Sequence, residues 1–121
     1  MSYKIKHRDD GDHYRLTIFG EAESNEKLGE VARNMEDILL HANAKNVLLD
    51  ITRLKGRFGL FGGMSHTRTI PDHMKKVRMA VLDLPENKVA DRDFQTFTSN
   101  HGFQFKFFTE KEAALDWLKR D

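Results

Sequence analysis

Apolar and polar residues alternate on both sides of an early turn signal, which predicts a β-hairpin at the start of the chain. Positions 9–12, Asp-Asp-Gly-Asp, supply the turn chemistry. The alternating positions are Tyr3, Ile5 and His7 before the turn and Tyr14, Leu16 and Ile18 after it.

An amphipathic helix is predicted next, because apolar residues recur at spacings of three and four between positions 28 and 42. Ser24 is its expected N-cap, and Asn46 is the expected break after it. The apolar positions are Leu28, Val31, Ala32, Met35, Ile38, Leu39 and Ala42.

Short apolar runs at residues 47–51 and 77–82 predict two strands that are covered on both faces. The four glycines between residues 55 and 64 predict a loop and then a short, weak helix that ends near Pro71, since each glycine costs a helix roughly 1 kcal/mol relative to alanine. Helical spacing from Val89 to Thr98, a stop at Gly102 and alternating phenylalanines over residues 103–107 predict a further helix and strand.

The closing helix is predicted by the sequence Thr109-Glu110-Lys111-Glu112, which fits a capping box. In that motif the threonine hydroxyl accepts from the backbone N–H of the glutamate, and the glutamate carboxylate reaches back. The resulting order, ββαβαβαβα, is typical of a single α/β domain over residues 1–121, with a largely parallel or mixed sheet and helices packed on it.

Composition supports one independently folding domain, because 39% of the 121 residues are hydrophobic and nine are phenylalanine. The absence of cysteine excludes disulfides, thiolate metal sites and cysteine nucleophiles. The first residues lack the apolar core of a signal peptide, so we expect a cytoplasmic protein. General frequency makes a homodimer a reasonable expectation.

Charge is unevenly distributed although the formal net charge is only +1. Residues 53–78 carry seven basic side chains against one acidic side chain, whereas the segments before and after them are net negative. Such clustering indicates a partner or an anionic surface rather than a fold. Nucleic acid is the least favoured partner, because no RNA- or DNA-binding motif accompanies the cluster.

No residue set indicates catalysis, a metal or a cofactor. The glycine segment matches neither nucleotide-binding fingerprint, and the six histidines show no dense ligand spacing. Ser65 lies next to His66, but adjacent helical residues point in different directions. We therefore expect a binding protein rather than an enzyme.

Asp50 is the expected polar residue of a ligand site, because ligands of open α/β sheets bind outside the carboxyl ends of the strands. A loop cap or an ion pair with Arg53 is the competing interpretation. The expected apolar contacts to a ligand are Phe58, Leu60, Phe61 and Met64, and the expected contacts to an acidic partner or anionic surface are Arg53, Lys55, Arg57 and Arg68.

The chain resembles the SpoIIAA-like family, relatives of the STAS domains of anti-sigma-factor antagonists, in the opening hairpin and in three further stretches, at residues 47–56, 93–103 and 109–118. This resemblance implies a STAS-like fold, comparable to the CRAL-TRIO architecture, with four or five strands and about four helices. It also implies protein-protein regulation or association with hydrophobic ligands or membranes. Antagonists carry a phosphorylatable serine where this chain has residues 58–62, which contain no hydroxyl, so Ser65 and Thr67 are the nearest alternatives.

Two functions therefore stay open. In the first, residues 55–71 form a flap over an apolar pocket beside Asp50 that binds a small hydrophobic or anionic ligand, or they touch a membrane surface peripherally. In the second, the basic side chains dock an acidic protein partner without the phosphoserine switch.

Overall fold

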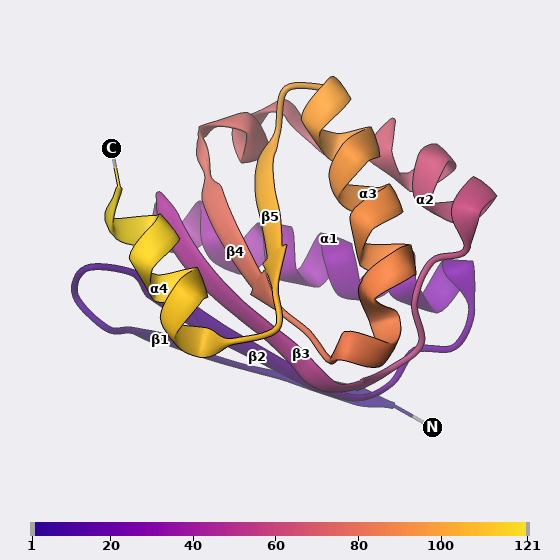
Figure 1. Ribbon diagram of the computed structural model, residues 1–121, viewed down its shortest axis with the longest axis horizontal. Helices are drawn as coiled ribbons and strands as arrows, with labels where there is room; N and C mark the ends of the chain where they lie inside the picture. Colours follow the sequence, from indigo (N-terminus) through magenta and orange to yellow (C-terminus); the bar gives the residue numbers. More distant parts are fainter. Residues whose placement is uncertain (1, 121) are drawn as a thin grey trace.

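The computed structural model describes residues 2–120, which form one five-stranded mixed sheet in the order β1-β2-β3-β4-β5 (Figure 1). The first two strands pair antiparallel, and each later strand pairs parallel with the one before it. The strands are β1 (Tyr3–Asp9), β2 (Tyr14–Glu21), β3 (Asn46–Lys55), β4 (Arg78–Leu82) and β5 (Gln104–Phe108).

The helices follow the order ββαβαβαβα that the sequence predicts. They are α1 (Asn25–Ala42), α2 (Leu60–Thr67), α3 (Lys88–Asn100) and α4 (Lys111–Lys119), with short 3-10 turns η1 (Asp72–Lys76) and η2 (Pro85–Asn87). The main core lies between one face of the sheet and α1 and α3, while α4 packs against the other face (Figure 1). The fold class is thus confirmed as α/β with a mixed sheet.

The hairpin turn forms where the acidic and glycine residues predict it. Gly11 adopts a φ of 96°, which favours glycine, and its N–H donates to Asp9 Oδ1 at 2.9 Å. The side chains of Lys4, Lys6 and Arg8 on β1, at one edge of the sheet, are exposed.

Helix α1 begins at its predicted N-cap and ends at Ala42, the last of its predicted apolar positions, but the residue that breaks it differs from the predicted one. Ser24 accepts a hydrogen bond from the backbone N–H of Lys27 at 3.0 Å, which satisfies one free donor of the first turn. Asn43, not Asn46, ends the helix, because it adopts a left-handed φ of 51° and its N–H donates back to Leu39 and Leu40. Asn46 instead begins β3.

The glycine segment divides into a loop and the eight-residue helix α2. Gly56 has a φ of 106°, and a Cβ there would overlap the backbone carbonyl of Ala22. Gly63 is buried against Phe94 and Phe97 of α3, so a small residue lets the two helices approach closely. The helix ends at Thr67, four residues before Pro71.

The predicted capping box does not form. Helix α4 begins at Lys111, so Glu110 takes the N-cap position without a side-chain hydrogen bond, and Thr109 lies one residue too early. Tertiary contacts anchor the helix instead. Arg78 stacks 4.4 Å from the centre of the Trp117 ring and donates to the Trp117 carbonyl at 2.8 Å.

Candidate functional site

A cavity of about 130 Å³ lies between the sheet and helices α1, α2 and α3. Its wall is mostly apolar, and an engineered protein cavity of about 150 Å³ is large enough to bind benzene. The sheet contributes Ile18, Leu49, Ile51, Met79, Val81 and Phe105, and α1 contributes Leu28, Val31, Ala32 and Met35. This is the concave, apolar kind of site that binds small molecules.

Three stacked rings close one side of the cavity. The ring of Phe58, in the loop before α2, stacks on His66 of α2 at 4.7 Å between centroids and on Phe94 of α3 at 5.9 Å. Burial, helped by the nearby charge of Arg33, lowers the pKa of His66 below its ordinary value. His66 is therefore neutral at pH 7 and behaves as part of an aromatic wall.

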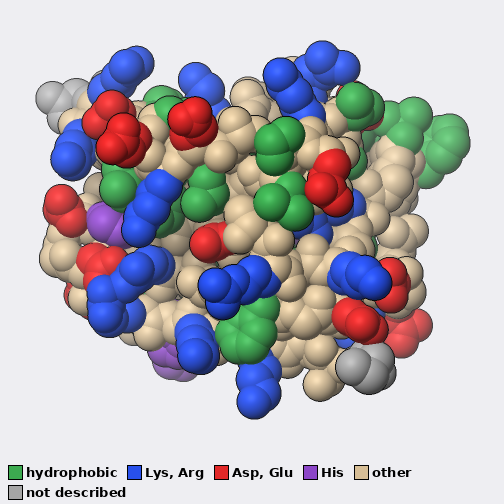
Figure 2. Space-filling view, turned by 60° about the horizontal axis from the view of Figure 1, so that its bottom comes forward, with side chains coloured by type: hydrophobic (Ala, Val, Ile, Leu, Met, Phe, Trp, Pro, Cys, Tyr) green, Lys and Arg blue, Asp and Glu red, His purple; other side chains and the backbone are tan. Residues whose placement is uncertain are grey.

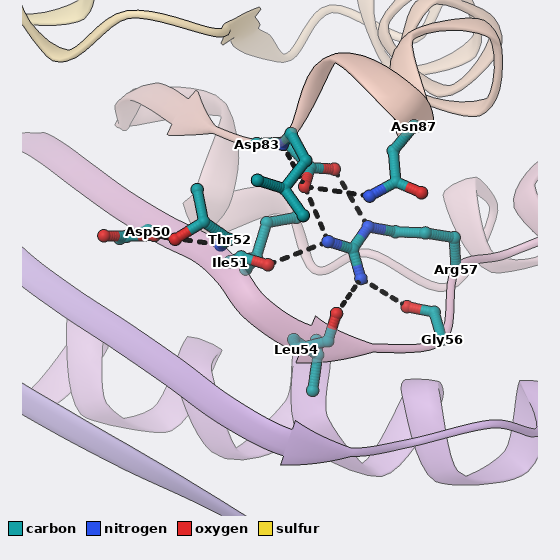
Figure 3. A network of polar contacts seen from close by, with 9 residues as sticks. Asp50, Ile51, Thr52, Leu54, Gly56, Arg57, Asp83 and Asn87 are labelled. Carbon is teal, nitrogen blue, oxygen red and sulfur yellow. Dashed lines mark hydrogen bonds and ion pairs between the residues drawn. The ribbon is translucent and has the colours of Figure 1, made fainter.

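Arg57 lies at the same end of the cavity, in a closed network of polar contacts (Figure 3). Its Nε and Nη2 donate to the two carboxylate oxygens of Asp83 at 2.9 and 2.6 Å, a bidentate pair. The remaining N–H groups donate to the backbone carbonyls of Ile51, Leu54 and Gly56 at 2.6–2.8 Å. All five donors of the guanidinium are engaged, so Arg57 has none left for an anionic ligand.

Asp83 and Asp91 form a pair of buried carboxyl groups beside this arginine. Burial, the hydrogen bond to Asp83 and its charge together raise the pKa of Asp91 to about 8. Burial alone would raise the pKa of Asp83 too, but hydrogen bonds from Arg57 and Asp91 outweigh it and hold that pKa below its ordinary value. At pH 7 Asp83 is thus the ionised partner, and Asp91, which lines the cavity, is protonated.

Glu36 of α1 is the second carboxyl group in the cavity wall. Its side chain lies one helical turn along α1 from Ala32, another lining residue, and is only 7% exposed. Burial, with a smaller contribution from the charge of Asp37, raises its pKa to about 7 against the opposing effect of Arg33. The cavity therefore combines apolar walls with two acids that are easily protonated.

No model of a known protein family and no curated protein matches the chain. A solved structure of an uncharacterized DUF3478 family protein from Shewanella loihica PV-4, described as having a SpoIIAA-like fold, superposes with a TM-score of 0.60 at 27% identity, covering 96% of this chain and 93% of that chain. The chain has a SpoIIAA-like fold. An anti-sigma factor antagonist from Mycobacterium paratuberculosis shares this fold at 12% identity, with a TM-score of 0.62 and coverage of 98% and 96%.

Within this SpoIIAA-like fold, Asp50 does not lie where the sequence placed it. Strand β3 continues to Lys55, so Asp50 is in the middle of the strand rather than at its carboxyl end. It is not among the residues that line the cavity, which include its neighbours Leu49 and Ile51 from the opposite face of the strand. Its carboxylate accepts from the backbone and hydroxyl of Thr52 at 2.9 and 2.7 Å.

Of the four expected apolar contacts, Phe58 alone lines this cavity. Leu60 is 51% exposed and borders a separate hollow of about 370 Å³ between α2 and α3. Phe61 is 79% exposed and Met64 is 38% exposed, so both point away from the core. Figure 2 shows hydrophobic side chains projecting at the right edge, the side on which α2 lies in Figure 1.

The expected basic surface is smaller than the sequence suggested. Arg57 is removed from it by its ion pair with Asp83, in which the side chains are 14% and 1% exposed. Arg53 and Lys55, near the end of β3, and Arg68, directly after α2, are exposed.

The hydroxyl groups of α2 differ in access. Thr67 is buried and donates to the Gly63 carbonyl at 2.8 Å, so a kinase could reach it only if the helix unfolded, whereas Ser65 is exposed. Residues 2–120 contain no cluster of three or more His, Asp or Glu side chains that could hold a metal ion. In the same range, no helix combines the length and apolar character needed to cross a bilayer.

Sequence reasoning missed the carboxyl groups of the site, although two of them gave a signal. Glu36 interrupts the apolar stripe of α1 at a position that faces the core. Asp83 directly follows β4, so the rule on strand carboxyl ends identifies it better than Asp50. Asp91 gave no such signal, because its environment depends on Asp83.

Proposed function

We propose that this chain is a non-catalytic binding module that holds one small, predominantly apolar ligand in the cavity between the sheet and helices α1, α2 and α3. The observation that carries the proposal is the cavity itself, about 130 Å³ with a mostly apolar wall. Residues 55–71 cover it through Phe58 and His66, as the flap hypothesis requires, although its polar groups are Glu36 and Asp91 rather than Asp50. An anionic ligand is less well supported, because Arg57 is fully engaged by Asp83 and by backbone carbonyls.

Benzyl alcohol, a neutral probe of about the size of the cavity, tests this proposal. We expect saturable shifts of backbone amide signals around the cavity in a protein NMR titration. We also expect a rise in melting temperature, because a ligand at ten times its Kd stabilises the folded state by about 1.4 kcal/mol.

A cavity-filling variant locates the binding site. Ala32→Leu adds a branched side chain to the cavity wall and should weaken benzyl alcohol binding at least tenfold. Ala42→Leu, at the exposed end of the same helix, is the matched control and should bind like the unmodified chain. Binding that is unaffected by Ala32→Leu would place the ligand elsewhere and refute the proposal.

A protein-interaction function is the second candidate, favoured by the exposed apolar side chains of α2 and by the fold shared with an anti-sigma factor antagonist. Reversing Arg53, Lys55 and Arg68 to glutamate should abolish salt-sensitive binding of a polyglutamate peptide, the simplest acidic probe. Arg57 is left unchanged in this test, because its substitution would disrupt the fold. Binding to phosphatidylserine vesicles instead of the peptide would assign the surface to a membrane.

A further inference from the structure

Glu36 is an acidic side chain that the fold holds in an apolar wall. It is 93% buried, as its 7% exposure indicates, and it lines the cavity. Among residues 2–120 its carboxyl group has no hydrogen-bond or ion-pair partner within bonding distance. Its oxygens are not sealed from solvent, because His73 Nε2 is the only fully buried side-chain polar atom without a partner in the part of the chain that the structure describes. An unpaired carboxyl group in an apolar wall is open to a ligand that can pair with it.

The charged and titratable groups around Glu36 come from each element packed at the cavity. On α1, Arg33 and Asp37 flank it, and both are exposed to solvent. His66 on α2 is neutral because burial lowers its pKa. Asp91 on α3 is protonated at pH 7 because burial and Asp83 raise its pKa to about 8.

Arg57 is the one arginine among the described residues that line the cavity, and its network leaves it unable to pair with Glu36 (Figure 3). Each of its N–H groups already donates to Asp83 or to a backbone carbonyl. The described lining residues therefore offer two carboxyl groups and no free cation. A negatively charged group on a ligand would lie against carboxyl groups, whereas a positively charged group could form an ion pair with one of them.

We propose that the ligand of this cavity is a small apolar amine, whose protonated nitrogen pairs with the carboxylate of Glu36 while its apolar body fills the space beneath Phe58 and His66. This inference rests on the proposed function and names its ligand class. Glu36 is then the residue that sets the charge preference of the site.

Proton release is the signature of this arrangement. Glu36 has a pKa of about 7, so it is mostly protonated at pH 6 in the free protein. An ammonium group that pairs with the carboxylate displaces this proton into solvent, while the ligand keeps its own proton and charge. Binding should release close to one proton at pH 6 and close to none at pH 8, and affinity should rise about tenfold between these values.

Three probes of matched size separate the possibilities: benzylamine, benzyl alcohol and benzoate. Isothermal titration calorimetry at pH 6 and pH 8, in buffers of different ionisation enthalpy, gives both the Kd and the number of protons released. We expect benzylamine to bind at least tenfold more tightly than benzyl alcohol at pH 8, and benzoate to bind most weakly. Benzyl alcohol should show neither proton release nor a change in affinity with pH.

Glu36→Gln keeps the size and polarity of the side chain and removes its charge. In this variant the preference for benzylamine and the proton release should disappear, while benzyl alcohol binding should persist. Asp37→Asn, one residue along on the exposed side of α1, is the matched control and should retain the preference.

Other outcomes have distinct meanings. Equal binding of benzylamine and benzyl alcohol without proton release would overturn this inference and leave the proposed function standing. Tightest binding of benzoate would also overturn it. If none of the three probes binds, both the inference and the proposed function fail.

Discussion

Asp91→Asn tests which carboxyl group of the buried Asp83–Asp91 pair holds the proton, because asparagine retains a hydrogen-bond donor for Asp83 but cannot titrate. In the folded chain the pKa of Asp91 is raised from 3.8 to about 8, so the folded state keeps a proton that the unfolded state has lost over this interval. The stabilising effect of that proton is complete below pH 3.8 and is lost as the pH rises to about 8. The free energy of unfolding should therefore fall by up to about 1.4 kcal/mol per pH unit through this group.

Urea denaturation at pH 5, 6, 7 and 8 measures this slope directly, provided that the m-value stays constant. We expect the unmodified chain to lose stability more steeply with pH than Asp91→Asn. A shallower slope of the same sign should remain in the variant, because the pKa of Glu36 is also raised, from 4.5 to about 7. Asp116→Asn, on the exposed side of α4, serves as the control and should follow the unmodified chain. Parallel curves for the Asp91 variant and the unmodified chain would refute the assignment of the proton to Asp91.

Three further substitutions test the fold around the site, each by urea denaturation. Arg57→Met leaves the Asp83 carboxylate buried without its partner and should cost about 3–5 kcal/mol, whereas Arg68→Met on the surface should cost less than about 0.5 kcal/mol; similar losses for the two would contradict the network. Gly56→Ala places a Cβ against a backbone carbonyl at a φ of 106° and should cost more than about 1 kcal/mol, and an unchanged midpoint would mean that the loop relaxes. Ser24→Ala removes the hydrogen bond that caps α1 and should cost about 1 kcal/mol, so a neutral result would show that water replaces the cap.

Periodicity predicted the order of the elements because each helix and strand buries one face or both, and burial leaves a direct trace in the sequence. It misplaced the end of β3 for the same reason. After Ile51 burial becomes intermittent, with Arg53 and Lys55 exposed and Leu54 buried, so the continuous apolar run stops before the strand does. As a result, Asp50 was predicted at the carboxyl end of the strand, although it lies in the middle of it.

The polar part of the site could not be predicted from local pattern, because it is built by pairs that are distant in sequence. Arg57 pairs with Asp83, which is 26 residues away along the chain, and no local sequence pattern near either residue indicates this contact. A basic side chain in a glycine-rich loop was therefore interpreted as a surface charge. The capping box does not form, and α4 is held instead by its packing on Leu48 and Ala80, which are distant in sequence.

The basic side chains of β1 also have a consequence for how copies of the chain meet. A strand at the edge of a sheet offers unpaired N–H and C=O groups to any other strand, and an extended apolar edge would join its sheet to a second one. Lys4 and Lys6 place exposed positive charge on this edge strand, while Arg8 pairs with Asp10 at 2.7 Å. Figure 2 shows Lys and Arg side chains, interspersed with Asp and Glu, over the face seen when the bottom of Figure 1 is turned forward. Like charges on two such edges would repel each other, which disfavours growth of the sheet from one copy into the next.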